Sequence, residues 1–256
     1  ELIVGRHLVD GRLRRTSRGG VVGAALAVAE DYGDLADGLL ALHQASAQPR
    51  WLTIAGELLD FALAHFADDS AAARETADRR DAADGGAPAD RGGAGFFDTG
   101  DDAEALVRRP KDPTDNAAPS GNSALANALL TYSALTGSLL HREAAEAALG
   151  FASEHGIRQP RFFGWALAAA EAVVSGPVQV AIVGEPSGGS LSSAAWRHRP
   201  PGAVVLSADP GASGLPLLAD RPLVDGGAAA YVCRGMVCDL PVTDVNALLS
   251  ALRPRA

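Results

Sequence analysis

The stretch 96–123, which reads FFDTGDDAEALVRRPKDPTDNAAPSGNS, holds the residues of this chain best suited to chemistry. Asp98 and Asp112 supply carboxylates, and a pair of carboxylates can hold sugar hydroxyls and act as general acid and base. Arg109 and Lys111 add positive charges that would bind an anionic group of a ligand. These four residues are therefore candidates for a binding or catalytic site.

The same stretch predicts a stiff loop that ends at the start of a helix. Its prolines fix φ and hold the preceding residues in extended conformations; they are Pro110, Pro113 and Pro119. Ser120 suits the N-cap of the next helix, where free N–H groups and Asn122 could meet an anion or a hydroxyl-rich ligand. Phe96 or Phe97 could stack on a ring, and Asp115 adds an acceptor. The alternative is a rigid loop with a good cap and internal salt bridges.

Acidic residues form a second cluster in the segment AEDYGDLADGLL. Like charges at helical spacing destabilise a helix unless they lie near its N-terminus or serve a partner. One interpretation is that Glu30, Asp31, Asp34 and Asp37 complement the helix dipole. The other is that these groups and Tyr32 line a ligand site, with Asp31 as an acid–base group.

Two cysteines, Cys233 and Cys238, lie in the segment YVCRGMVCDLPV. Their spacing is not the C-x-x-C of a thioredoxin-type motif. If residues 234–237 form a hairpin loop, the two sulfurs could face each other. Two reduced structural thiols and a redox or regulatory pair are both compatible with this sequence.

The sequence predicts no metal site and no cofactor. Its six histidines are scattered, without the H-x-x-x-H or H-E-x-x-H spacing of a metal site. The segment GEPSGGS follows an apolar run and resembles a phosphate-binding turn, but it is neither G-x-G-x-x-G nor a P-loop. We therefore expect no nucleotide at this turn.

Paired helices must position most of these candidates. Apolar residues recur at helical spacing in five segments, namely 24–45, 51–66, 123–135, 140–154 and 162–174. Short breaks between neighbouring segments predict antiparallel hairpins. A shift of 90 residues places Leu39 on Leu129 and His65 on His155, which indicates an internal repeat. Residues 67–95 are rich in charge, Ala and Gly, and predict a disordered acidic insertion.

The two ends of the chain follow other patterns. Residues 1–20 predict an extended segment or a hairpin that turns at Asp10-Gly11. Beyond Pro177, β-branched runs predict strands at 178–184, 203–208 and 228–232, and Thr243 or Asp244 would cap a last helix. The expected fold is mainly α: an incomplete (α/α) toroid of helix hairpins over 1–176, with a small α/β appendage over 177–256.

Composition narrows the classes of partner. The chain has 256 residues, 47% of them hydrophobic, and a net charge of −9, which argues against nucleic acid and anionic membranes as partners. No apolar run approaches the ~20 residues of a membrane span, and Arg6 and His7 break the first apolar run, so we expect no signal peptide. Cytoplasm is the expected location. The start at Glu1 favours a fragment or a trimmed chain.

Three blocks of the chain resemble one protein family. They are EDYGDLADGLLALHQAS, GGAGFFDTGDDAEALVRRPKDPTDNAAPSGNSALANALLTYSALTG and AAYVCRGMVCDLPVTD. In this order they are similar to the uncharacterised thioredoxin-domain-containing proteins related to spermatogenesis-associated protein twenty. The resemblance implies an N-terminal thioredoxin-like domain followed by a toroid like those of six-hairpin glycosidases, with this chain as the C-terminal part. The long insertion and Gly33, where a small Ala would be usual, depart from the family pattern.

Two functional hypotheses follow. In the first, the mouth of the toroid binds or processes a carbohydrate-like ligand, with Asp31, Asp98 and Asp112 as catalytic groups. Its ligand-binding residues would be Glu30, Tyr32, Asp34, Phe97, Arg109, Lys111, Ser120 and Asn122. In the second, the chain is a non-catalytic scaffold or recruiting module for an upstream thioredoxin-like redox domain, and Cys233 and Cys238 are redox candidates.

Overall fold

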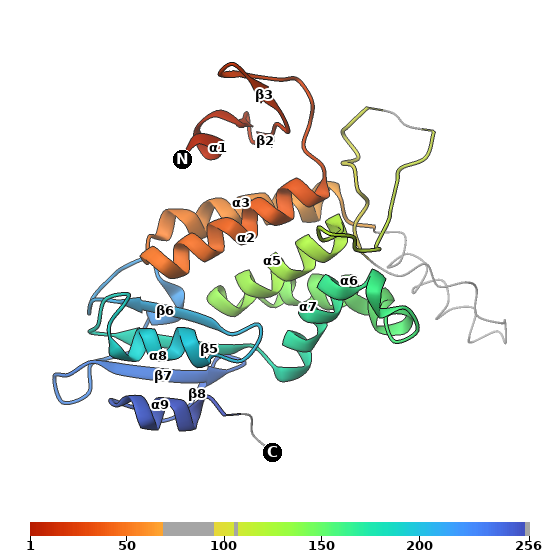
Figure 1. Ribbon diagram of the computed structural model, residues 1–256. Helices are drawn as coiled ribbons and strands as arrows, with labels where there is room; N and C mark the ends of the chain where they lie inside the picture. The colour runs from red at the N-terminus through yellow and green to blue at the C-terminus, as the bar shows by residue number, and fades with distance from the viewer. Residues whose placement is uncertain (69–94, 105–106, 254–256) are drawn as a thin grey trace, which may run out of the picture.

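The computed structural model describes residues 1–68, 95–104 and 107–253. Most of the predicted acidic insertion lies outside these residues. The two ends of the insertion are joined, because the Asp68 N–H donates to the Gly95 carbonyl at 2.8 Å and Ala67 pairs with Phe96. The described chain is mainly α-helical, as predicted, and its main sheet lies in the C-terminal part (Figure 1).

Two helix hairpins form the centre of the molecule. They are α2 (Ala29–Ser46) with α3 (Pro49–His65), and α5 (Gly121–Thr136) with α6 (Leu139–His155). The predicted repeat is confirmed, since Ser46 and Thr136 end α2 and α5 at a shift of 136 − 46 = 90 residues. No helix within the described residues is both long and apolar enough to cross a membrane.

Three helices, α2, α5 and α7, run parallel to one another, with their N-termini at the same end of the molecule. A Cβ built on Gly33 would lie 2.6 Å from the Ala124 carbonyl carbon, and one on Gly121 would lie 2.8 Å from the Ala29 Cβ, so α2 and α5 are in close contact. α5 also packs on α7 (Gly164–Ser175). The hairpin partners α3 and α6 complete this layer (Figure 1).

A mixed sheet lies against the helical layer. Its strands, in spatial order, are β6 (Val204–Ala208), β5 (Val178–Val183), β7 (Ala229–Arg234) and β8 (Val237–Cys238). Only β5 and β6 run parallel. The three longer strands and the last helix confirm the elements that the sequence predicts beyond Pro177.

The sheet buries both of its faces. Val180 and Ile182 pack toward α8 (Ser190–His198) and α9 (Val245–Ala251), whereas Ala181 and Val183 belong to the same core as the helical hairpins. A buried hydrogen bond also joins the layers, because the Val205 N–H donates to the Gln44 side-chain oxygen of α2 at 3.0 Å. The sheet is therefore an inner layer between α8–α9 and the hairpins (Figure 1).

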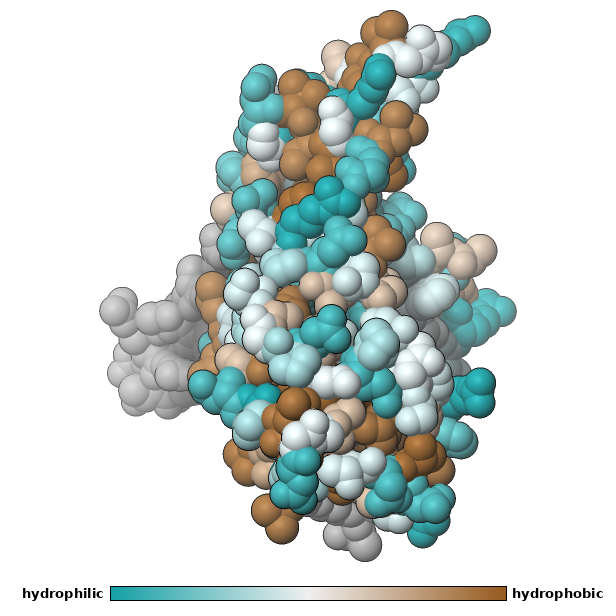
Figure 2. All heavy atoms as spheres, turned by 90° about the vertical axis from the view of Figure 1, so that its left-hand side faces the viewer, coloured by the Kyte–Doolittle hydropathy of each residue, from teal (hydrophilic) through white to brown (hydrophobic). Residues whose placement is uncertain are grey.

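The N-terminal segment projects from α2 and α3 (Figure 1). It contains α1 (Leu2–Arg6) and the short strands β1 (Leu8–Val9), β2 (Arg12–Leu13), β3 (Ser17–Arg18) and β4 (Val21–Val22). The predicted turn is confirmed, with φ of 50° at Asp10 and 75° at Gly11. The sequence did not predict α1. Hydrophobic residues gather on this projection (Figure 2), and its exposed large ones are Leu2, Ile3 and Val21.

Candidate functional site

The amino ends of α2 and α5 meet at the loop that the sequence singles out. The Ala29 N–H donates to the Asp98 carbonyl at 3.0 Å, and the Asp98 N–H donates to the Pro110 carbonyl at 2.9 Å. Gly121 lies against Ala29 and the Glu30 backbone nitrogen. The structure therefore brings the acidic cluster of α2 next to Asp98 and Asp112.

Asp98 is the half-buried centre of this junction. Its carboxylate accepts hydrogen bonds from the Asp112 N–H at 3.3 and 3.4 Å. Burial raises the pKa of Asp98, the charges of Asp112 and Glu30 raise it further, and the hydrogen bond from Asp112 partly offsets these effects. A carboxyl group that keeps its proton to higher pH is suited to act as a general acid.

An acidic row continues along α2 from Glu30 to Asp34 and Asp37, at the i, i+4 and i+7 positions of one face. The pKa of Asp34 is raised by burial and then by the charges of Glu30, Asp37 and Asp31. Burial also raises the pKa of Asp37, whose carboxylate accepts a hydrogen bond from the Asn127 amide at 3.1 Å. Asp112, Asp98, Glu30, Asp34 and Asp37 therefore form one electrostatically connected row, called the acidic row below.

A depression of about 440 Å³ lies at the Asp37 end of the acidic row. α2, α5, α8 and the segment 199–204 line it, with polar and aromatic side chains that include Asp37, Gln44, Asn127, Thr131, Trp196 and Arg199. The Arg199 guanidinium lies 4.3 Å from the Trp196 ring centroid. Sequence reasoning did not predict this part of the site, because α8 belongs to the C-terminal region and lies far from α2 and α5 in the sequence.

Asp31 belongs to the N-terminus of α2. Its carboxylate accepts a hydrogen bond from the Val28 N–H at 2.9 Å and lies 3.4 Å from the Arg15 guanidinium. It also lines a second depression of about 440 Å³ beneath the N-terminal segment, together with Asp34. Asp31 therefore caps a helix and pairs with a cation, which leaves it less suited to catalysis than Asp98.

Three predicted ligand-binding residues hold the fold together. Tyr32 is fully buried, stacks on Phe61 and accepts a hydrogen bond from the Leu13 N–H. Asn122 is buried and joins two segments, donating to the Ala148 carbonyl at 2.9 Å and accepting from the Phe96 N–H at 3.1 Å. Ser120 caps α5, as the sequence predicts, by accepting from the Ser123 N–H at 3.2 Å.

The two cations that the sequence proposes as anion-binding groups, Arg109 and Lys111, are also engaged. Arg109 donates to the carbonyls of His65 and Thr99 at 3.0 and 2.6 Å, and its guanidinium lies 4.1 Å from the Phe97 ring centroid. Lys111 lies 2.7 Å from the Asp68 carboxylate. An anionic ligand would have to displace these contacts, and a stacking ligand would compete with Arg109 for Phe97.

Asp115 has a role that sequence reasoning missed. Its buried carboxylate accepts hydrogen bonds from the N–H groups of Ser120, Trp165 and Ala166 at 3.0, 2.9 and 3.1 Å. It therefore joins the N-termini of α5 and α7. The sequence offered one signal for this role, a carboxylate shortly before the N-cap of α5. The hydrogen-bond donors on α7 could not be predicted, because they lie about 50 residues from Asp115 in the sequence.

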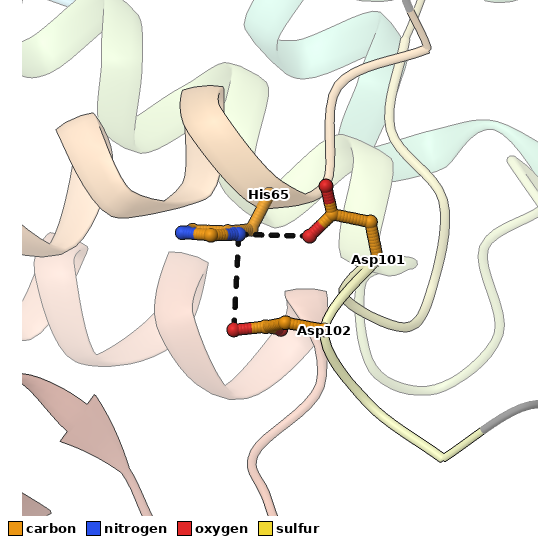
Figure 3. A group of neighbouring side chains, drawn as sticks. All are labelled: His65, Asp101 and Asp102. Atoms are coloured by element: carbon orange, nitrogen blue, oxygen red, sulfur yellow. Dashed lines mark hydrogen bonds and ion pairs between the residues drawn. The ribbon is translucent and has the colours of Figure 1, made fainter.

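One group of described residues has the composition of a metal site. Figure 3 shows His65, at the end of α3, facing Asp101 and Asp102, with its Nδ1 atom 2.8 and 3.7 Å from the two carboxylates. The hydrogen bond with His65 holds the pKa of Asp101 below its usual range. Because the Arg12 guanidinium already pairs with Asp102, a metal ion would compete with an internal cation. We therefore assign the group to holding the loop against α3.

The turn GEPSGGS does not offer a free anion site. Glu185 accepts a hydrogen bond from the Ser192 N–H at 3.0 Å, and the Ser190 hydroxyl donates to it at 3.2 Å. A carboxylate therefore occupies the N-terminus of α8, where a phosphate would have to bind.

A further depression, of about 660 Å³, lies away from the acidic row, between α3, the end of α5 and the loop 212–219. Three of its polar side chains are engaged within the protein. Asp60 lies 3.1 Å from His141 Nε2, and the hydroxyls of Thr53 and Thr136 donate to backbone carbonyls of their own helices. We place the candidate site at the acidic row because no cation of the described residues forms an ion pair with any of its five carboxylates, although Asp37, Asp98 and Asp112 accept hydrogen bonds.

Cys233 and Cys238 form a disulfide across the β7–β8 hairpin. The residues face each other in register, and the turn between the strands is Gly235-Met236, where φ is 58° and 69°. The hairpin that the sequence considered is present, and the sulfurs are bonded rather than present as two reduced thiols.

The acidic row should cost stability, which gives a first prediction. Asp34→Asn removes the like-charge pairs with Glu30 and Asp37, so it should raise the free energy of unfolding at pH 7 by about 0.4–1 kcal/mol. The raised pKa means that the penalty develops as pH rises above the unfolded value of 3.8 and is absent below it.

Urea unfolding at pH 7 and at pH 3 measures this effect. The exposed Glu143→Gln on α6 is the control and should change stability by less than about 0.5 kcal/mol at either pH. A loss of stability in Asp34→Asn at pH 7, or a gain that persists at pH 3, would contradict the electrostatic account of the row.

Comparison with known proteins gives one group of relatives, and no protein-family model matches the chain. The chain is 28% identical to spermatogenesis-associated protein 20 of Rattus norvegicus over 257 residues, which cover 93% of the chain and 30% of that protein. The protein of the same name from Homo sapiens is 28% identical over 267 residues, or 97% of the chain and 31% of the relative. The chain spans about 30% of the length of these curated relatives. Over most of its length it is therefore a weak homologue of spermatogenesis-associated protein 20, which supports the family resemblance of the three sequence blocks.

Proposed function

We propose that the helical layer is an arc of an (α/α) toroid that binds or processes an uncharged or cationic polyhydroxylated ligand, such as a sugar or amino sugar, along the acidic row. The observation that carries this proposal is that none of the five carboxylates forms an ion pair with a cation of the described chain. Clustered carboxylates without counter-ions destabilise a fold, and such costs are typical of functional sites.

The helix dipole accounts for only part of the row. It acts within the first turn of a helix, and α2 begins at Ala29. Glu30 lies in that turn, whereas Asp34 and Asp37 lie beyond it. These two residues therefore support a ligand-binding role better than a capping role.

The proposed chemistry places a proton on Asp98 and a negative charge on its neighbours. Asp98, whose pKa is raised, would donate a proton to a ligand oxygen, and Glu30 or Asp112 would accept one. The depression lined by Asp37, Asn127 and Trp196 would hold the remainder of the ligand. Because Arg109 and Lys111 are engaged, sugar phosphates would bind less well than neutral or amino sugars.

A thermal-shift panel tests the proposal. Glucose, glucosamine, sorbitol and glucose 6-phosphate would be added at millimolar concentration to the chain and to its Asp37→Asn and Asp98→Asn variants. We expect a rise in Tm with a neutral or amino sugar that is at least halved in both variants and unchanged in the exposed Asp209→Asn control. A complete absence of shifts, or equal shifts in all variants, would count against the proposal.

The second candidate is a non-catalytic scaffold or recruiting module for an upstream thioredoxin-like domain. The observation that favours it is the projecting N-terminal segment, where Leu2, Ile3 and Val21 are exposed next to the point at which an upstream domain would attach. Exposed apolar groups of this kind are typical of interaction surfaces. In this case Asp98→Asn would leave function intact, while Leu2→Ser with Ile3→Ser would weaken association of the two parts in a binding assay.

A further inference from the structure

The guanidinium of Arg221 lies directly against the Cys233–Cys238 disulfide. Its Nη2 atom is 3.3 Å from the Cys238 sulfur and 3.6 Å from the Cys233 sulfur. Cys233 is fully buried, whereas Cys238 is an exposed residue of the edge strand β8. Both side chains therefore lie on the same face of the hairpin, with Cys233 toward the buried strand β7 and Cys238 toward the exposed edge, and the cation contacts both sulfurs.

Arg221 lacks a strong counter-ion in this position. Its Nη1 donates to the Ala219 carbonyl at 2.9 Å, its Nε atom is buried without a hydrogen-bond partner, and no described carboxylate lies within ion-pair distance of it. The neighbouring charged or titratable groups are Asp220 and Tyr231, and the Tyr231 hydroxyl donates to the Pro222 carbonyl. Disulfide sulfur is a weak acceptor, so oxidation leaves this half-buried cation poorly compensated.

Reduction would supply the missing negative charge. A thiolate at either cysteine would lie beside the guanidinium, and a neighbouring cation favours the thiolate over the thiol. A disulfide whose reduced form is stabilised in this way is a better oxidant than one without such a partner. The cation therefore favours reduction of this pair.

We propose that Cys233, Cys238 and Arg221 form a thiol–disulfide exchange site whose substrates are small thiols or dithiols. The incoming thiolate attacks the exposed Cys238 sulfur, and a mixed disulfide forms while the bond between Cys238 and Cys233 breaks. The electron pair leaves on Cys233 as a thiolate beside Arg221. A second thiol, as its thiolate, attacks the incoming sulfur of the mixed disulfide and releases the Cys238 thiolate.

The exchange balances without any other reactant. Two substrate thiols are oxidised to one disulfide, and the protein disulfide gains two electrons and two protons to become two thiols. The protons come from the two substrate thiols. In the opposite direction, an oxidised small disulfide re-forms the bond between Cys233 and Cys238.

Equilibration of the whole chain in glutathione redox buffers tests this site. The reduced fraction would be measured by alkylation and mass spectrometry for the wild type, Arg221→Gln and Arg221→Lys. We expect the equilibrium constant for reduction to fall about tenfold in Arg221→Gln and to stay within about threefold of wild type in Arg221→Lys. The exposed Arg158→Gln is the control for loss of a positive charge and should match the wild type.

These outcomes distinguish an effect of the Arg221 charge from an effect of its packing. Equal constants in the wild type and Arg221→Gln would overturn the proposal, and so would an equal fall in both Arg221 variants, since that would indicate packing rather than charge. Circular dichroism of each oxidised variant checks its fold. The rate at which reduced protein reacts with iodoacetamide near pH 7 is a second readout, and it should be lower in Arg221→Gln than in Arg221→Lys.

Discussion

Replacing Asp115 by alanine is expected to lower the free energy of unfolding by about 3–5 kcal/mol. Asp115 is 2% exposed, and its carboxylate is the shared acceptor for the N–H groups of Ser120, Trp165 and Ala166. Alanine leaves these donors without that acceptor at the ends of two helices, where N–H groups lack intrahelical partners. Urea unfolding followed by circular dichroism measures the loss.

Asp112→Ala is the matched control, because Asp112 lies in the same loop and is exposed. Its carboxylate accepts from Thr114, two residues along the chain, so its removal should cost less than about 1 kcal/mol. The loss of stability in Asp115→Asn should lie between those of the two alanine variants. The amide oxygen of asparagine can still accept a hydrogen bond, but its NH₂ group is itself a donor and would face N–H donors. Similar losses for Asp115→Ala and Asp112→Ala would show that Asp115 does not join α5 to α7.

Local sequence signals predicted the elements well, because helix starts and short turns are decided by neighbouring residues. Ser120 was expected as one N-cap, and Thr243 or Asp244 as another; Ser120 and Asp244 each accept a hydrogen bond from the N–H three residues later. Asp10-Gly11 was expected as a hairpin turn, and both residues have positive φ. The repeat of the hairpins was visible for the same reason, since apolar spacing is a property of each segment alone.

The partners of charged side chains could not be predicted in this way. Arg109 and Lys111 were interpreted as ligand-binding charges, but their contacts are with His65, Thr99 and Asp68 of the protein itself. The group of His65, Asp101 and Asp102 joins His65 to two adjacent aspartates that lie 36 or more positions later in the sequence, so no short metal motif could reveal it. Such pairings are set by tertiary packing.

The candidate site was accessible to sequence reasoning only in part. Glu30, Asp34, Asp98 and Asp112 were expected to act together, and the structure places them in one row. Tyr32 and Asn122 were grouped with them because polar side chains near a helix start resemble ligand-binding groups. Burial, which the sequence does not reveal for a single polar residue, assigns both to the core.

Gly33→Ala is expected to destabilise the protein by about 1–3 kcal/mol, although alanine is the better helix former. A Cβ at position 33 would lie 2.6–2.7 Å from atoms of Ala124 and Leu125, two of them backbone atoms. Backbone atoms cannot rotate away as a flexible side chain can, so α2 and α5 must separate. Glycine at this position therefore fits the close packing of the two helices.

Gly38→Ala, on the same helix, is expected to have the opposite effect on stability. Gly38 is exposed, and a methyl group at this position would meet no atom within 4 Å, so alanine should stabilise α2 by about 1 kcal/mol. Both variants would be compared by urea unfolding. The helix separation in Gly33→Ala should also weaken the Asn127–Asp37 hydrogen bond across α2 and α5, and hence sugar binding, whereas Gly38→Ala should leave binding unchanged. Two variants that change stability in the same direction would contradict this account, because only close contact between α2 and α5 distinguishes the two glycines.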